Sequence, residues 1–187
     1  MLDFTGVNLI LILSIMSIII PSHTVIFAQE IVPQSSNPNQ FVQLVTSGLD
    51  APTTMAFLGP SDILVAQKND GTIKRIVNGE ILEQPVLDVN VNAKDERGML
   101  GIATTKNITT GKTYVYLFYT ESEGDDGAEP IGNRLYRYEL VDNKLVNPKL
   151  LLDLPYLPGP AHNGGVISIG PDNNVYVAIG ELMLIPS

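Results

Sequence analysis

One pattern recurs along the chain and restricts its fold more than any other feature. A short apolar run leads through a turn rich in Gly, Pro and Asp to a second apolar run, in residues 55–66, 100–116 and 167–178. The spacing of about fifty residues is the scale of the blades of a β-propeller. A β-sandwich with similar hairpins is the alternative, because a hairpin alone does not distinguish the two folds.

The rest of the body has the periodicity of strands. Residues 69–71 (Asn-Asp-Gly) form a hairpin turn before a β-branched run at 72–77. The aromatic segment 114–119 suits a pleated, largely buried strand, and 134–140 alternates polar and apolar residues as expected for a half-exposed strand. After residue 41, no window of twelve or more residues shows a helical stripe. The sequence therefore predicts an all-β fold.

An apolar segment precedes this body. Residues 7–20 are almost wholly apolar, and Pro21 ends the run. The run is shorter than the ~20 residues that span a bilayer, so it indicates the hydrophobic helix of a signal peptide, with cleavage near Ala28. Asp3 and the lack of Lys or Arg before the run are atypical of a signal peptide. A membrane anchor through residues 7–20, a wrongly placed start of the chain and a buried core helix are the alternatives.

These segments divide the chain into three parts. We expect a signal peptide or anchor at residues 1–28, a Pro/Ser/Asn-rich linker at 29–40 and a partial propeller at 41–187. A blade takes about 40–50 residues and closed rings have about 4–8 blades, so the body would hold only about three. We expect a truncated chain, or another chain that supplies the remaining blades. The leader predicts a secreted or extracytoplasmic protein.

Composition and missing motifs exclude several classes of function. The net charge of −9 leaves no basic surface for nucleic acid. Cysteine is absent, which excludes disulfides and thiolate chemistry. The sequence also lacks the glycine-rich fingerprints of nicotinamide and nucleotide binding and the G-x-S-x-G motif of serine hydrolases.

Two loops carry candidate site residues. His162 follows Pro and Gly and precedes Asn163 and a Gly pair, and imidazole is the side chain best suited to accept a proton near neutral pH. A histidine that only bonds its neighbours is the alternative. Glu96 and Arg97 lie just before an apolar strand. They could line the same rim of the propeller's central channel as His162 and bind a polar or anionic ligand there. A solvated turn is the alternative there.

Two further motifs have weaker implications. The acidic run at residues 121–129 offers carboxylates to calcium, but its spacing fits no EF-hand, and a solvated loop is the simpler interpretation. Residues 107–109 (Asn-Ile-Thr) form an N-glycosylation sequon, which fits an exposed loop of an exported protein.

Several segments in order resemble the glucose/sorbosone dehydrogenase family, which includes soluble aldose sugar dehydrogenases dependent on pyrroloquinoline quinone (PQQ). The matching segments are 49–57, 62–67 with 71–76, 96–103 (E-R-G-M-L-G-I-A), 133–138, and 162–165 (H-N-G-G) with 170–180. The resemblance implies a six-bladed propeller with PQQ and calcium at the top of its channel. Glu181 stands where the family often has Asp.

The resemblance also implies roles for residues. His162 would be the general base that removes the proton from the C1 hydroxyl of an aldose while hydride passes to the quinone, and an external acceptor would take the electrons. Glu96, Arg97 and His162 are the candidate cofactor-binding residues. The family's other PQQ and calcium contacts belong mainly to later blades, so no metal ligand is assigned in this chain. A non-enzymatic sugar- or partner-binding fragment and a gene remnant are the alternatives.

Overall fold

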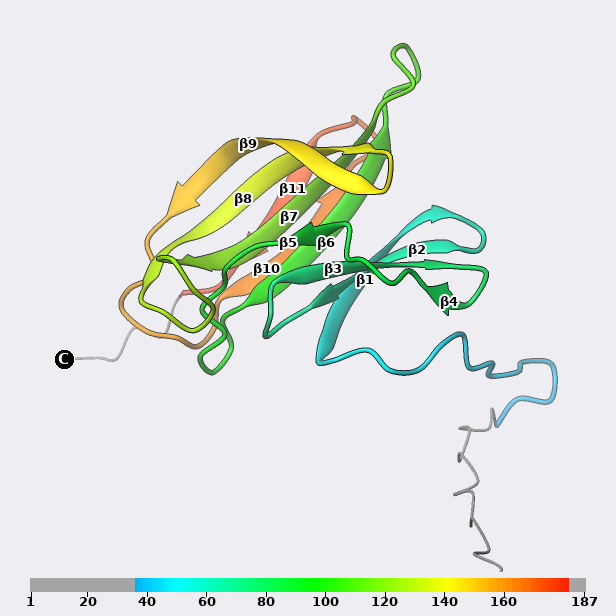
Figure 1. Ribbon diagram of the computed structural model, residues 1–187, viewed down its shortest axis with the longest axis horizontal. Coiled ribbons are helices and arrows are strands. Elements are labelled where there is room, and N and C mark those ends of the chain that lie inside the picture. The colour runs from blue at the N-terminus through cyan, green and yellow to red at the C-terminus, as the bar shows by residue number, and fades with distance from the viewer. Residues whose placement is uncertain (1–35, 182–187) are drawn as a thin grey trace, which may run out of the picture. The chain divides into compact units, whose positions relative to one another are not determined.

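The computed structural model describes residues 36–181 of the 187-residue chain (Figure 1). The predicted signal peptide or anchor, its leader helix and the membrane association of residues 7–20 lie outside this range, as does most of the linker. The chain divides into two compact units, Met1–Gln43 and Leu44–Ser187, and every strand belongs to the second. Between residues 36 and 181 the regular structure is β, which confirms the all-β prediction, and no helix there is long and apolar enough to cross a membrane.

The strands form three antiparallel sheets. The first contains β1 (Pro52–Gly59), β2 (Asp62–Gln67), β3 (Thr72–Val77) and β4 (Glu80–Ile81) in sequence order, and β5 (Leu87–Asp88) pairs with β3. The second contains β6 (Met99–Lys106), β7 (Thr113–Ser122), β8 (Pro130–Val141) and β9 (Lys144–Leu154). The third contains β10 (Gly164–Ile169) and β11 (Val175–Ile179).

The sheets meet through their first strands. Strand β6 packs between β1 and β10, so that the innermost strands of three successive sheets are neighbours (Figure 1). Within each sheet the strands follow in sequence order away from this centre. This arrangement is the one expected for consecutive propeller blades.

Two apolar layers separate the sheets, and β7 contributes to both. Leu117 and its neighbours two residues away face the first sheet, whereas Phe118 faces the third. Both side chains are fully buried. The layer towards the third sheet is completed by Leu135 and Ile167. Burial on both faces explains why this strand has an uninterrupted apolar and aromatic sequence rather than an alternating one.

A pair of glycines allows β10 to lie close to β6. A Cβ atom at Gly101 would collide with the backbone carbonyl oxygen of Gly165. Gly165 has φ +107, which L side chains rarely adopt, and a Cβ there would lie 2.8 Å from Leu100 Cβ. Both positions therefore require glycine for the third sheet to pack against the second.

Candidate functional site

Antiparallel pairing of β10 with β11 brings together two residues that are distant in sequence. Gly164 pairs with Ile179, and the turn between the strands is closed by a hydrogen bond from Gly170 N to Asn174 O at 2.9 Å. Residues just before β10 and just after β11 consequently lie side by side. His162 and Glu181 occupy these positions.

The His162 imidazole is held by a carboxylate. Its Nδ1 contacts Glu181 Oε1, and its backbone N–H donates to Glu96 Oε2 at 2.5 Å. The hydrogen bond with Glu181 raises the pKa of His162, and the charges of Glu181 and Glu96 add to the effect. The same hydrogen bond lowers the pKa of Glu181. All three groups lie on the exposed rim, and the histidine side chain is 52% exposed.

This geometry leaves one ring nitrogen available. When the neutral imidazole donates its Nδ1 proton to Glu181, the lone pair is on Nε2, which has no partner in residues 36–181. A carboxylate that fixes one nitrogen and leaves the other free for proton transfer is the arrangement found in catalytic base pairs. The site can therefore accept a proton from a hydroxyl group placed at its mouth.

The loop before His162 is fixed to the loop that carries Glu96. Glu96 N donates to Pro160 O at 3.2 Å, and Asn163 Nδ2 donates to the same carbonyl at 2.7 Å. Asn163 is fully buried, and its Oδ1 has no partner among the described residues. These contacts position Glu96 and His162 relative to each other.

Arg97 faces a different environment from Glu96. Its side chain is buried, it donates from Nη2 to Tyr156 O at 2.6 Å, and its guanidinium lies 5.4 Å from the centre of the Tyr156 ring. Burial lowers the pKa of Arg97, although arginine remains charged. Its Nε has no hydrogen-bond partner, and none of the carboxylates in residues 36–181 forms an ion pair with it. Asp95 and Glu129 are close enough to offset part of this charge, and the free Nε–H remains a donor for a ligand.

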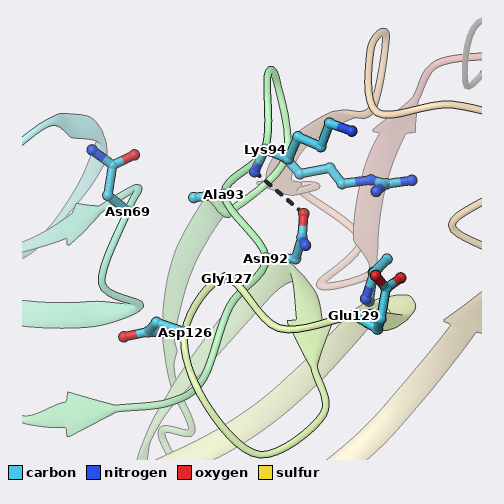
Figure 2. Close-up of a pocket in the computed structure, with 9 residues that line it drawn as sticks. Asn69, Asn92, Ala93, Lys94, Asp126, Gly127 and Glu129 are labelled. Atoms are coloured by element: carbon cyan, nitrogen blue, oxygen red, sulfur yellow. Dashed lines mark hydrogen bonds between the residues drawn. The ribbon is translucent and has the colours of Figure 1, made fainter.

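Arg97 also lines a cavity of about 580 Å³ (Figure 2). The other lining residues are Asn69, Asn92, Ala93, Lys94, Asp126, Gly127, Glu129 and Pro130. The size is within the range of small-molecule sites, and the lining is mostly polar. Glu96 and His162 do not line the cavity. Lys94 and Arg97, which line the cavity, flank the segment that carries Glu96, whose carboxylate accepts from His162 N.

The acidic run has mainly structural contacts. Glu121 Oε2 accepts hydrogen bonds from Arg134 Nη1 and from the Tyr136 hydroxyl, both at 2.8 Å. Burial, with a contribution from Glu121, raises the pKa of Tyr136 to about 12. Asp126 Oδ1 accepts from Val91 N at 2.8 Å. Residues 36–181 contain no group of three or more carboxylate, histidine or cysteine side chains that could hold a metal ion.

The structure thus joins two of the three predicted site residues. Glu96 and His162 are in contact, whereas Arg97 turns towards Tyr156 and the cavity. The sequence analysis noted Glu181 only as a departure from the family pattern and did not foresee its contact with His162. A signal was present, because a hairpin closed by the turn at residues 170–174 places the two strand ends together. Tyr156 carried no such signal.

Comparisons with known proteins agree with this architecture. A putative oxidoreductase (glucose dehydrogenase) from Thermus thermophilus is 29% identical, with a TM-score of 0.64 over 76% of this chain and 41% of its own. The PQQ-bound aldose sugar dehydrogenase from Streptomyces coelicolor is 28% identical, with a TM-score of 0.61 over 74% of this chain and 40% of its own. These neighbours confirm the propeller-family fold predicted from the sequence.

Curated relatives and a family model add to this result. The Hedgehog-interacting protein of Homo sapiens is 27% identical over an alignment of 157 residues that covers 76% of this chain and 22% of that protein. The chain therefore spans about a fifth of the curated relative and about two fifths of the solved structures. The model described as Glucose / Sorbosone dehydrogenase matches residues 49–185, so this chain belongs to the glucose/sorbosone dehydrogenase family.

Proposed function

We propose that this chain is part of an oxidoreductase that oxidises an aldose sugar at its C1 hydroxyl with PQQ as the hydride acceptor. One observation carries the proposal: His162 has its Nδ1 against the Glu181 carboxylate, its backbone held by Glu96, and its Nε2 free at an exposed rim. A pair of this kind is built to accept a proton, and the family membership supports the choice of substrate and cofactor.

The proposed step uses the chain's own residues for proton transfer. His162 Nε2 accepts the proton of the sugar's C1 hydroxyl, and the imidazolium that forms is stabilised by the Glu181 carboxylate. Glu96 holds the backbone of His162 and adds negative charge beside the ring. PQQ, when bound, supplies the acceptor for the hydride, and an external acceptor then takes the electrons.

Two cationic residues that line the cavity fit a cofactor that carries carboxylates. Arg97 is a buried cation with an unpartnered Nε, and it lines a polar cavity together with Lys94. PQQ has three carboxyl groups, and arginine is the residue that suits buried ion pairs with such groups. Arg97 and Lys94 would therefore hold a carboxylate of the cofactor. The side chains of residues 36–181 do not fit a calcium site, and we derive no step through that ion.

The test uses cofactor binding and turnover as separate measurements. The chain is incubated with PQQ and calcium, binding is followed by the quinone absorbance, and aldose oxidation is followed with an electron-accepting dye. We expect His162→Asn to retain binding and lose dye reduction, because the proton acceptor is removed. We expect Arg97→Gln to weaken binding. Undiminished turnover in His162→Asn would exclude the general-base role.

A second candidate is a non-enzymatic propeller that binds a partner protein or a sugar. The names of the curated human and mouse relatives, both Hedgehog-interacting proteins, favour it. This alternative predicts binding that does not depend on quinone and is unaffected by His162→Asn. Loss of dye reduction in that variant would favour the enzyme instead.

We also propose that the protein is exported and that residues 1–28 direct export, as a cleaved signal peptide or as an anchor through residues 7–20. In a secreting host, N-terminal sequencing of the exported protein would identify cleavage near Ala28. An intact N-terminus in the membrane fraction would identify the anchor. Retention in the cytoplasm would contradict both.

A further inference from the structure

The hairpin between β6 and β7 carries the sequence Asn107-Ile108-Thr109 at its tip. It is the only Asn-x-Ser/Thr triplet in the 187 residues. The hairpin projects beyond the neighbouring strands (Figure 1), and Lys106 pairs with Thr113 at its base. All three residues of the triplet are exposed, and Ile108 is 96% exposed. Nothing in the described part of the chain covers this tip.

The local hydrogen bonds fix the Asn107 side chain with its amide nitrogen free. Asn107 Oδ1 accepts hydrogen bonds from Thr109 N at 3.0 Å and Thr110 N at 2.9 Å. The backbone of the tip is closed by bonds from Asn107 N to Lys112 O and from Gly111 N to Asn107 O, both at 2.8 Å. Neither Asn107 Nδ2 nor the Thr109 hydroxyl has a partner in residues 36–181. An enzyme can therefore reach both groups without unfolding the sheet.

We propose that Asn107 is a site of N-linked glycosylation. A membrane oligosaccharyltransferase would supply the reaction, with a lipid-phosphate-linked oligosaccharide as donor. A bond forms between Asn107 Nδ2 and the anomeric carbon of the sugar, the bond from that carbon to the phosphate oxygen breaks, and the lipid phosphate leaves. A base of the transferase takes the amide proton. The inference requires export but does not depend on the redox function, so the two can fail separately.

The position of Asn107 leaves the exposed surface around His162 open. Strand β6 begins two residues after Arg97 and ends at Lys106, directly before Asn107. Its 8 residues extend over about 26 Å at about 3.3 Å per residue. A glycan on Asn107 would therefore stand at the end of the sheet opposite the candidate site, where it would shield the exposed Ile108 without covering His162.

The experiment expresses the full chain behind a secretion signal in a host that carries out N-glycosylation. The secreted protein is treated with an amidase that removes N-glycans in heavy-oxygen water, and peptides are mapped by mass spectrometry. We expect a single glycosylated form, which migrates as one faster band on a gel after treatment. In its peptide, Asn107 should be converted to heavy-oxygen-labelled Asp. We expect Asn107→Gln and Thr109→Ala to abolish the modification, and Thr109→Ser to retain it.

A matched control tests whether the host can modify an exposed turn of this chain. In the Asn107→Gln background, Glu80→Thr creates a new sequon at Asn78, which is exposed in the turn between β3 and β4. An unmodified wild-type chain alongside a modified control would overturn the proposal. If no chain is secreted, the purified protein incubated with solubilised transferase and lipid-linked oligosaccharide gives the same readout, and unmodified Asn107 there would also overturn it.

Discussion

The second and third sheets of this protein differ in how they are enclosed. Strand β7 of the second sheet is covered on both faces, and Leu117 and Phe118, which point in opposite directions, are fully buried. In the third sheet, one face packs against the second sheet through Ile167, whereas Val166 on the other face is 67% exposed and Tyr176 is 55% exposed. The second sheet is a core element, and the third is a hairpin packed on it.

The candidate site lies on the less enclosed of the two sheets. His162 lies two residues before β10 and Glu181 two residues after β11, so their contact depends on the pairing of these two strands and on their packing against β6. Within residues 36–181 few buried contacts support this hairpin, which predicts a lower local stability than that of the second sheet. We therefore expect substitutions in the second sheet to affect folding and substitutions at the β6–β10 contact to affect the site.

The largest expected effect tests whether the second sheet is a core element. Leu117→Ala removes a fully buried side chain from β7 and should lower the free energy of unfolding by about 2–5 kcal/mol, because a cavity remains where packing was dense. Denaturant unfolding followed by circular dichroism measures this loss. A change below about 0.5 kcal/mol, the size of a surface effect, would mean that β7 is not a core strand.

The next effect acts on the contact between the sheets. Gly101→Ala would place a methyl group against the Gly165 carbonyl, so β10 must shift, at a cost of about 1–3 kcal/mol. Amide exchange should accelerate in β10 and β11 more than in β7 and β8. Gly59→Ala is a matched control, since a Cβ there meets its nearest atom at an ordinary 3.8 Å. Equal acceleration in all strands would contradict a separately seated hairpin.

How much of this difference the sequence could predict depends on whether a feature is set by neighbouring residues or by residues distant in the chain. The strands and their turns are local features, and both the uninterrupted run at residues 114–119 and the alternating run at 134–140 were correctly predicted as strands. The family resemblance identified the propeller, although no periodicity predicts which sheet covers which. Predicting the contact between Glu181 and His162 would have required knowledge of the pairing register between β10 and β11. The different directions of Glu96 and Arg97 depend on the distant Pro160 and Tyr156, which no pattern marks.

The third prediction concerns the pH dependence of the site. The raised pKa of His162 contributes stability that is complete below the unfolded value of about 6.5 and is lost as the pH rises through the folded value. The lowered pKa of Glu181 contributes stability that is present above about 4.3 and is lost as the pH falls through its folded value. The pair is therefore strongest between about pH 4.3 and 6.5.

Titration of the imidazole protons by NMR tests this assignment, and the sequence has only two histidines to distinguish. Glu181→Gln removes the carboxylate that contacts Nδ1 and should lower the pKa of His162. Glu123→Gln removes an exposed carboxylate with no contact to the ring and should leave that pKa unchanged. Equal titration curves for the wild type and Glu181→Gln would show that the two ends of the hairpin do not meet in solution.

The smallest expected effect comes from two adjacent residues of β10 that point to opposite faces. Ile167→Val removes a methyl group from the layer between the sheets and should cost about 0.5–1.5 kcal/mol, whereas Val166→Thr on the exposed face should stay within about 0.5 kcal/mol. Denaturant unfolding compares the two variants with the wild type. A cost for Val166→Thr as large as that for Ile167→Val would mean that the outer face of the hairpin is covered in solution. The third sheet would then resemble the second, and the difference in enclosure on which the lower stability of the site rests would disappear.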